Sequence, residues 1–257
     1  MNIHKQDLYK KVIKTLMLVS FLFALSFQTD SDAFKNSQIK YKNVKTAYTN
    51  KWENLQKLLK DKGIDINNFE IHIRSFKYEK QLEIWCRNKS SEKFVLLKTM
   101  DICASSGDLG PKRKEGDGQV PEGFYEVSWF NPMSDYHLGL KINYPNASDR
   151  KKAKGRPGGD IMIHGNCVTI GCIPLQDEPI EELYVLCVET KNKKHEVGVS
   201  IYPCRLTNQN FDLLNKNHDA EKIKFWTVLK SVYQYFEDNK TLPKITLDKN
   251  GDYVLAG

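Results

Sequence analysis

Residues 160–175 read DIMIHGNCVTIGCIPL and join a short strand-like run to a turn that contains two glycines. Side chains alternate between the two faces of an extended chain, so Asp160, Met162 and His164 would share one face and two isoleucines the other. The isoleucines would anchor the strand in a core. This arrangement predicts that His164 faces a cleft.

The turn after this strand presents a cysteine eight residues beyond the histidine. Gly165 and Gly171 permit backbone geometries that other residues resist, so the turn can bring Cys172 back toward the imidazole. The imidazole of His164 can take the thiol proton, and the thiolate is a nucleophile that attacks acyl carbon. Backbone N–H groups around Gly171 and Cys172 are candidate oxyanion donors, each worth about 3–4 kcal/mol in a hydrolase. Thr169 can hydrogen-bond locally and brace the turn.

Three other interpretations of these residues stay open on spacing alone. His164 and Cys172 can be ordinary structural side chains. Cys167 and Cys172 can form a small redox disulfide, although they lack the C-x-x-C spacing of thioredoxin-like proteins. His137, His164 and Cys172 have the ligand types of a zinc site, but no H-E-x-x-H or C-x-x-C motif accompanies them.

The composition is that of a globular protein. The chain has 257 residues, of which 40% are hydrophobic, enough for one sizeable domain or a domain with a small appendage. The formal charge is +7; four lysines and one aspartate in residues 1–26 contribute +3 of it, which leaves +4. This mild excess suits an anionic surface such as a cell-wall polymer and is too small to indicate nucleic-acid binding.

The N-terminus has the pattern of an export signal. Lysines precede residues 16–27, an apolar run of 12 residues, whereas a membrane-spanning helix needs about 20. We interpret residues 1–26 as a signal peptide; the alternative is a short uncleaved anchor, which would be the only membrane contact. Both interpretations place the rest of the chain outside the cytoplasm, in the periplasm or cell envelope.

Six cysteines in an exported protein would ordinarily suggest three disulfides. Four of them lie in or beside apolar, strand-like stretches, where a free cysteine behaves as a small buried hydrophobe. A nucleophilic Cys172 must also be free. We therefore expect mostly unpaired core thiols and one reactive thiol; the four core positions are Cys86, Cys103, Cys187 and Cys204.

Hydrophobic periodicity predicts an α+β fold that is mainly β, since strands do not alternate with crossover helices. Residues 27–66 are expected to form a linker, flexible and polar over residues 28–38, and an N-terminal helix. The catalytic domain is expected over residues 67–205, with a helical C-terminal extension, residues 206–257, packed on it. The predicted strands are residues 69–76, 81–87, 92–103, 124–130, 138–144, 160–164, 195–203 and one in 243–255. The predicted helices are 44–60 and 179–190, with amphipathic helices over 211–237.

Residues 169–175, TIGCIPL, preceded by IHG at 163–165, resemble the signature of the L,D-transpeptidase (YkuD-type) catalytic domain family. Ile170 replaces a second histidine of the motif, and the short interval from histidine to cysteine is similar to the YafK-like branch. Further segments extend the resemblance over roughly residues 70–205. They read GDLGPK at 107–112, GDGQVPEGFY at 116–125 and LKINYPN at 140–146.

The resemblance implies a β-sandwich-like mixed sheet with the cysteine in a cleft. It implies that Cys172 attacks the carbonyl between an L-centre and a D-centre of a peptidoglycan stem peptide, with His164 as base and then acid and backbone amides near Gly171 at the oxyanion. An amine from a second stem peptide or a wall-attached protein would resolve the thioester in cell-wall crosslinking or remodelling. A hydrolase that cleaves the same bonds and a non-catalytic wall-binding module are the alternatives. Thiol and imidazole suffice, so no organic cofactor or metal is implied.

Four further residues are candidates for substrate binding: Gly165, Asn143, Tyr144 and Arg205. Arg205 can clamp a carboxylate with two hydrogen bonds, or pair with an acidic neighbour. The basic segments at residues 112–114 and 151–156 can meet anionic stem peptides, or form solvated loops.

Overall fold

The computed structural model describes residues 32–256. The predicted export signal, residues 1–26, lies outside them. The chain divides into residues 1–33 and a compact unit, Phe34–Gly257, which contains the sheet and the candidate site. Among the described residues, no helix combines the length and apolar character that crossing a bilayer requires.

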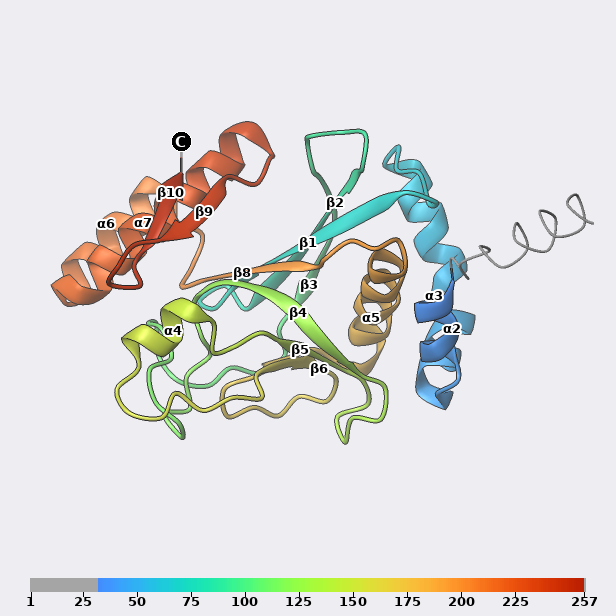
Figure 1. Cartoon of the computed structure of the whole chain (residues 1–257), viewed down its shortest axis with the longest axis horizontal. Helices are drawn as coiled ribbons and strands as arrows, with labels where there is room; N and C mark the ends of the chain where they lie inside the picture. Colours follow the sequence, from blue (N-terminus) through green and yellow to red (C-terminus); the bar gives the residue numbers. More distant parts are fainter. Residues whose placement is uncertain (1–31, 257) are drawn as a thin grey trace, which may run out of the picture. The chain divides into compact units, whose positions relative to one another are not determined.

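An eight-stranded mixed sheet forms the body of the compact unit, in the order β3-β2-β1-β8-β4-β5-β6-β7 (Figure 1). Neighbouring strands are antiparallel except for the pairs β1–β8 and β6–β7, which are parallel. With helices flanking the sheet, the predicted α+β class is confirmed. The strands are β1 (Phe69–Phe76), β2 (Gln81–Asn88), β3 (Val95–Asp101), β4 (Gly123–Asn131), β5 (Gly139–Ile142), β6 (Met162–His164), β7 (Ile173–Pro174) and β8 (Gly198–Tyr202).

Helix α5 (Asp177–Asn192) packs on the sheet, and α3 (Lys42–Asp61) packs on α5 (Figure 1). The predicted helix at 44–60 is confirmed as α3, whose buried residues recur at helical spacing. The prediction of a flexible segment at 28–38 is wrong where it overlaps α2 (Ala33–Ile39). The ring of Phe34 packs edge-on against Phe130, with 5.0 Å between centroids, a tertiary contact that no local pattern reveals.

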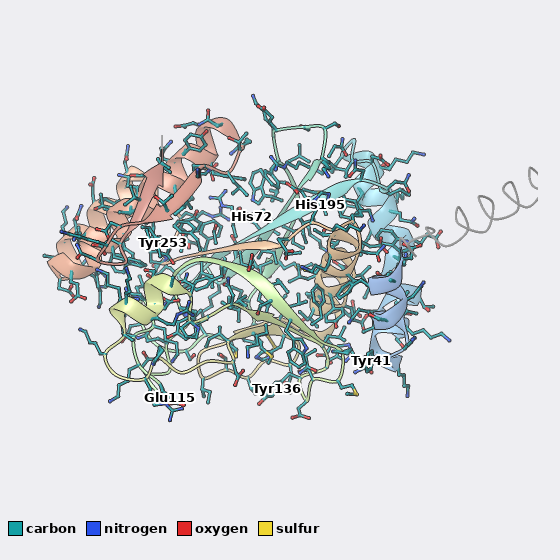
Figure 2. The ribbon with its side chains drawn as sticks, viewed as in Figure 1. Tyr41, His72, Glu115, Tyr136, His195 and Tyr253 are labelled. Carbon is teal, nitrogen blue, oxygen red and sulfur yellow. A yellow bond between two sulfur atoms is a disulfide. The ribbon has the colours of Figure 1, made fainter. Side chains whose placement is uncertain are left out.

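The C-terminal extension comprises α6 (Asn208–Asn217), α7 (Ala220–Asn239) and the hairpin of β9 (Lys244–Leu247) with β10 (Tyr253–Ala256). The predicted helices are confirmed, whereas the predicted single strand is a separate two-stranded sheet. Tyr253, labelled in Figure 2, ties the hairpin to the body: its hydroxyl accepts a hydrogen bond from the side chain of Asn146 at 2.7 Å. An apolar cluster joins the extension to the ends of β1 and β8; it includes Phe76, Tyr202, Phe211, Trp226, Leu229 and Tyr233.

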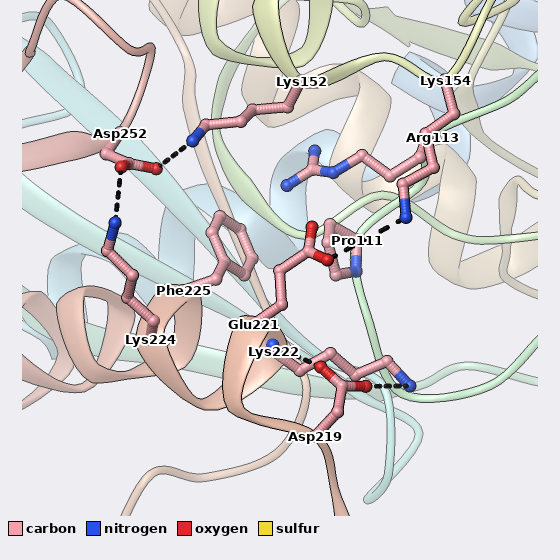
Figure 3. A pocket seen from close by; sticks show the side chains of 10 residues that line it. All are labelled: Pro111, Arg113, Lys152, Lys154, Asp219, Glu221, Lys222, Lys224, Phe225 and Asp252. Atoms are coloured by element: carbon pink, nitrogen blue, oxygen red, sulfur yellow. Dashed lines mark hydrogen bonds and ion pairs between the residues drawn. The ribbon is translucent and has the colours of Figure 1, made fainter.

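A charged cavity of about 220 Å³ lies where the extension meets the short helix α4 (Ala147–Lys152) and the connection before β4 (Figure 3). Lys152 and Lys224 both pair with Asp252, at 2.5 and 3.1 Å. The guanidinium of Arg113 lies over the ring of Phe225, 5.3 Å from its centroid. Residues of both basic segments therefore contact the C-terminal extension.

Candidate active site around Cys172

Cys172 directly precedes β7, at the edge of the sheet. Strands β6 and β7 pair in parallel register, with Ile163 opposite Ile173 and His164 opposite Pro174. Side chains alternate along both strands, so Cys172 comes beside Met162 and on the same side of the sheet as His164. The backbone N–H of Met162 hydrogen-bonds to the Cys172 sulfur.

Cys172 is half-buried and lines a cavity of about 150 Å³. The connection between β3 and β4 provides most of the cavity wall, and Ser75 near the end of β1 and Lys77 just after it provide another part. His164 is not among the lining residues. It is 2% exposed, and its ring lies 4.7 Å from that of Tyr136, which is labelled in Figure 2. The prediction that His164 faces a cleft is therefore wrong, because Tyr136 covers it.

Burial favours the neutral forms of both the His164 imidazole and the Cys172 thiol. Burial lowers the pKa of His164, and the hydrogen bond from Nδ1 to the Gly165 carbonyl, at 2.6 Å, partly opposes this effect. Because a carbonyl can only accept, Nδ1 carries the proton and Nε2 keeps its lone pair. Burial raises the pKa of Cys172; the Met162 N–H opposes this shift, Asp160 adds to it and Lys112 opposes it. A neutral imidazole and a neutral thiol are the starting state for general-base activation.

The turn before Cys172 is braced by one side chain. The hydroxyl of Thr169 donates to the Cys172 carbonyl at 2.8 Å and accepts from the Gly171 N–H at 3.1 Å. Gly171 has φ 137°, and a Cβ there would lie 3.1 Å from the carbonyl oxygen of Gln119. Since Thr169 engages the Gly171 amide, the amide of Cys172 itself is the remaining predicted oxyanion donor.

Asp160 does not share the face of His164. It adopts φ 57°, so the extended run predicted from residue 160 begins at Met162 instead. Its carboxylate pairs with Lys141 of β5 at 2.5 Å. Its carbonyl oxygen accepts from the Cys172 thiol at 3.7 Å. The predicted strand is therefore wrong in its first two residues.

Two cysteines predicted to be independent form a disulfide between Cys103 and Cys167, with 5.5 Å between the Cα atoms. The expectation of a free core thiol at Cys103 is wrong, and so is the alternative of a Cys167–Cys172 pair, because Cys172 is free. The bond joins the chain just after β3 to the turn that carries Cys172. Cys103 also donates its backbone N–H to the Pro174 carbonyl at 3.1 Å, so two links attach this segment to the β7 edge.

The four predicted substrate-binding residues lie outside the Cys172 cavity. Asn143 accepts from the Glu126 backbone at 3.1 Å, and the Tyr144 hydroxyl donates to the Pro157 carbonyl at 2.9 Å. Arg205 donates to Glu83 at 2.6 Å, so it has the acidic neighbour considered as one alternative. Gly165 is enclosed, because a Cβ there would lie 2.7 Å from a carboxylate oxygen of Asp177. Substrate binding by these residues stays a prediction.

Two serines that the sequence did not single out lie in the cavity wall. Ser75 and Ser106 have buried hydroxyl oxygens with no hydrogen-bond partner among the described residues. Buried hydroxyls are normally satisfied, so these two residues have unused hydrogen-bonding capacity in the cavity wall. Ser75 is 97 positions before Cys172, too far for any local pattern to connect them.

His137 pairs with Glu181 at 2.9 Å. Over residues 32–256, no three side chains of the histidine, cysteine or carboxylate type gather as metal ligands.

Comparison with known proteins identifies the family of this site. The L,D-transpeptidase catalytic domain matches residues 74–197, which include His164 and Cys172. YafK of Escherichia coli (strain K12), whose name assigns it provisionally to the L,D-transpeptidases, is 38% identical over 190 residues, which cover 72% of this chain and 74% of YafK. This chain belongs to the L,D-transpeptidase family.

Solved structures also resemble the chain. The helical cell shape determining protein Pgp2 from Campylobacter jejuni is 20% identical, with a TM-score of 0.44, and the match covers 71% of this chain and 74% of Pgp2. L,D-transpeptidase 1 of Mycobacterium tuberculosis is 12% identical, with a TM-score of 0.28 over 52% of this chain and 62% of that protein. The segment of this chain matched by the L,D-transpeptidase catalytic domain ends before α6, α7 and the C-terminal hairpin.

Proposed function

We propose that this protein is an exported cysteine acyltransferase that acts on peptidoglycan stem peptides through a thioester on Cys172. The observation that carries the proposal is the state of the cysteines. Cys86, Cys187 and Cys204 are buried, Cys103 and Cys167 are bonded to each other, and Cys172 is the half-buried free thiol on a cavity. Family membership supplies the class of chemistry.

The reaction begins with transfer of the Cys172 thiol proton to Nε2 of His164. The sulfur forms a bond to the carbonyl carbon of the peptide bond between an L-centre and a D-centre, and the amide of Cys172 stabilises the oxyanion. Collapse of this intermediate breaks the carbon–nitrogen bond, and the imidazolium returns its proton to the leaving amine. An acceptor amine then attacks the thioester and gives a proton to His164; the new amide forms as the carbon–sulfur bond breaks, and the Cys172 thiolate takes a proton back from the imidazolium. Water in place of the amine gives hydrolysis.

The unpartnered hydroxyls of Ser75 and Ser106 support peptide binding beside the thiol. Each can donate to a peptide carbonyl or accept from a peptide N–H. The predicted export signal at residues 1–26 supports action in the cell envelope. The substrate and the acceptor amine are both components of the cell wall.

Intact-mass spectrometry of the purified protein tests the proposal. The wild type, Cys172→Ala and Cys204→Ala are incubated with a murein tetrapeptide and, separately, with a carbapenem. Cys204 is the matched control, because it is also a free thiol and lines a cavity of about 330 Å³. We expect an adduct on the wild type and on Cys204→Ala and none on Cys172→Ala.

The products separate the possible activities. Crosslinked dimer supports the transferase, whereas shortened or released peptide alone assigns the protein as a hydrolase. An adduct that survives in Cys172→Ala contradicts the proposed nucleophile. If neither reagent modifies the wild type while a small alkylating agent does, the protein is a binding module.

A further inference from the structure

The wall of the Cys172 cavity comes mainly from a connection without regular secondary structure. Eight of the twelve lining residues belong to the 102–122 segment between β3 and β4, which contains neither helix nor strand. Connections of this length inside a compact domain are uncommon and are usually functional. A segment that forms a binding wall needs groups that hold it in one conformation.

Lys77 binds this segment through three backbone carbonyl groups. Its ammonium group donates to the carbonyl oxygens of Asp108, Gly110 and Val120, at 2.8, 2.9 and 3.0 Å. Its side chain is only 7% exposed, so little of the ammonium group is hydrated. Two of these carbonyls lie near the middle of the segment and the third lies close to its end, so one side chain fixes the distance between these two parts.

Glu122 neutralises the charge of Lys77 and also binds the 102–122 segment directly. Its carboxylate is fully buried and lies 3.0 Å from the Lys77 ammonium. The same carboxylate accepts from the Gly110 N–H at 2.7 Å. Lys77 and Glu122 thus bind the backbone carbonyl and the backbone N–H of the same residue, Gly110. Removing either partner would leave the other charge buried without its counter-ion.

The last member of this group comes from the C-terminal extension. The indole N–H of Trp226, a fully buried residue of α7, donates to the second oxygen of Glu122 at 2.6 Å. Helix α7 lies beyond the residues that match the catalytic domain. This contact therefore joins Glu122, inside the matched domain, to a helix outside it.

We propose that Lys77, Glu122 and Trp226 are positioning residues that hold the 107–110 segment against Cys172, and that α7 is thereby part of the active-site scaffold. The inference rests on the proposed acyl transfer at Cys172. None of the three touches the sulfur, so their loss changes how the peptide is held and leaves the reactivity of the thiol intact.

Two variants of the full chain test this inference. Glu122→Gln keeps the shape of the side chain and removes its charge, and Trp226→Phe removes only the indole donor. Trp85→Phe is the matched control, because the Trp85 indole donates to Glu83 at 2.7 Å in a buried pair away from the cavity. Glu237→Gln is the second control, since Glu237 ties α7 to Arg74 at 2.7 Å without reaching the wall.

Three readouts are compared in all variants. We expect acylation by the murein tetrapeptide to fall about tenfold or more in Glu122→Gln and Trp226→Phe, mainly through KM, as a lost hydrogen bond to a charged group predicts. Alkylation of Cys172 by iodoacetamide is expected to change less than twofold. Amide hydrogen exchange at residues 108–110 is expected to accelerate about tenfold, and both controls leave all three values near the wild type.

Equal acylation losses in the test and control variants, at temperatures where all are folded, would overturn the inference. So would unchanged exchange at residues 108–110. If the wild type is not acylated at all, the proposed function fails, and the exchange data still decide whether the three residues hold the segment.

Discussion

At the scale of single residues, the charge states of His164 and Cys172 predict the pH dependence of acylation. The pKa of His164 lies below its ordinary value of 6.5, so the imidazole stays a base to lower pH. The pKa of Cys172 lies above its ordinary value of 9.0, so the thiol stays protonated. We expect kcat/KM to rise with pH along a single limb centred below pH 6.5 and then to stay level to about pH 8.5.

His164→Gln should lose this acid limb and about 100-fold or more in rate, the usual contribution of a general base. Rates are measured as single-turnover acylation, so that resolution of the thioester does not mask the first step. A rate that falls between pH 6.5 and 8.5 would contradict the neutral pair, because it would require a protonated imidazole beside a thiolate.

Gly165 is a position where only glycine fits. A Cβ there would lie 2.7 Å from Asp177 Oδ1 and 2.8 Å from the Tyr136 carbonyl. Gly165→Ala should lower the free energy of unfolding by about 1–3 kcal/mol, and it should slow acylation because Tyr136 covers His164. Urea denaturation gives the first value. Gly159→Ala, with no atom within 4 Å, is the control expected to stay near the wild type.

At the scale of elements, the Cys103–Cys167 disulfide constrains the turn that carries Cys172. It closes a loop of 64 positions, and loop-closure entropy predicts a stabilisation of about 4 kcal/mol. The double variant Cys103→Ala/Cys167→Ala should lose up to this amount in urea denaturation. Dithiothreitol should shift the wild type to the same midpoint and leave the double variant unchanged; a reductant effect on the double variant would refute this assignment.

The raised pKa of Asp149, in the first turn of α4, leads to a second prediction at the level of elements. Burial raises the pKa of Asp149, which is 2% exposed, to about 6. The folded state therefore binds the carboxyl proton of Asp149 more tightly than the unfolded state, in which the pKa of aspartate is about 3.9. Ionisation of Asp149 should lower the free energy of unfolding by about 3 kcal/mol as the pH rises from about 4 to about 6.

Asp149→Asn should remove this loss, seen as the difference between the two proteins' urea-denaturation curves at pH 4 and pH 7. Asp219, the N-cap of α7, is the control of opposite sign. The hydrogen bond from the Lys222 amide lowers the pKa of Asp219, so Asp219→Asn should remove a contribution that the wild type loses as the pH falls. Parallel curves for the wild type and Asp149→Asn would disprove the assignment.

The helices and strands that could be predicted from the sequence are those whose apolar residues recur at a regular spacing. Helix α3 and strand β1 follow from their spacing of apolar residues, and the motif around Cys172 follows from residue types close in sequence. The remainder depends on contacts between distant segments. Ser75 and Lys77 reach the site from β1, Cys103 pairs across 64 positions, and α2 depends on the contact of Phe34 with Phe130. No local signal encodes such pairs, so the motif around Cys172 was predictable and the contacts that form the cavity wall beside it were not.

At the scale of the whole molecule, the C-terminal extension belongs to the same folding unit as the sheet. Phe76 and Tyr202, at the ends of β1 and β8, are at most 1% exposed because α7 covers them. The guanidinium of Arg74 lies 4.6 Å from the centroid of the Phe236 ring and pairs with Glu237. Removing the extension would expose two large aromatic side chains and leave a buried guanidinium without one of its carboxylates.

We therefore expect residues 34–205 alone to fail to unfold cooperatively, whereas residues 34–240, which keep α7 and lose the hairpin, should unfold cooperatively at a lower urea midpoint than residues 34–257. Burying each aromatic side chain contributes about 1.5–3 kcal/mol, and the loss of Glu237 leaves Arg74 with only the carboxylate of Glu83, 3.7 Å away, as its counter-ion. Together these losses are comparable to the whole stability of a domain, about 5–15 kcal/mol. Residues 34–205 that unfolded at the same midpoint as residues 34–257 would show that the sheet is stable without α7, and Trp226 could then be no more than a local contact of Glu122.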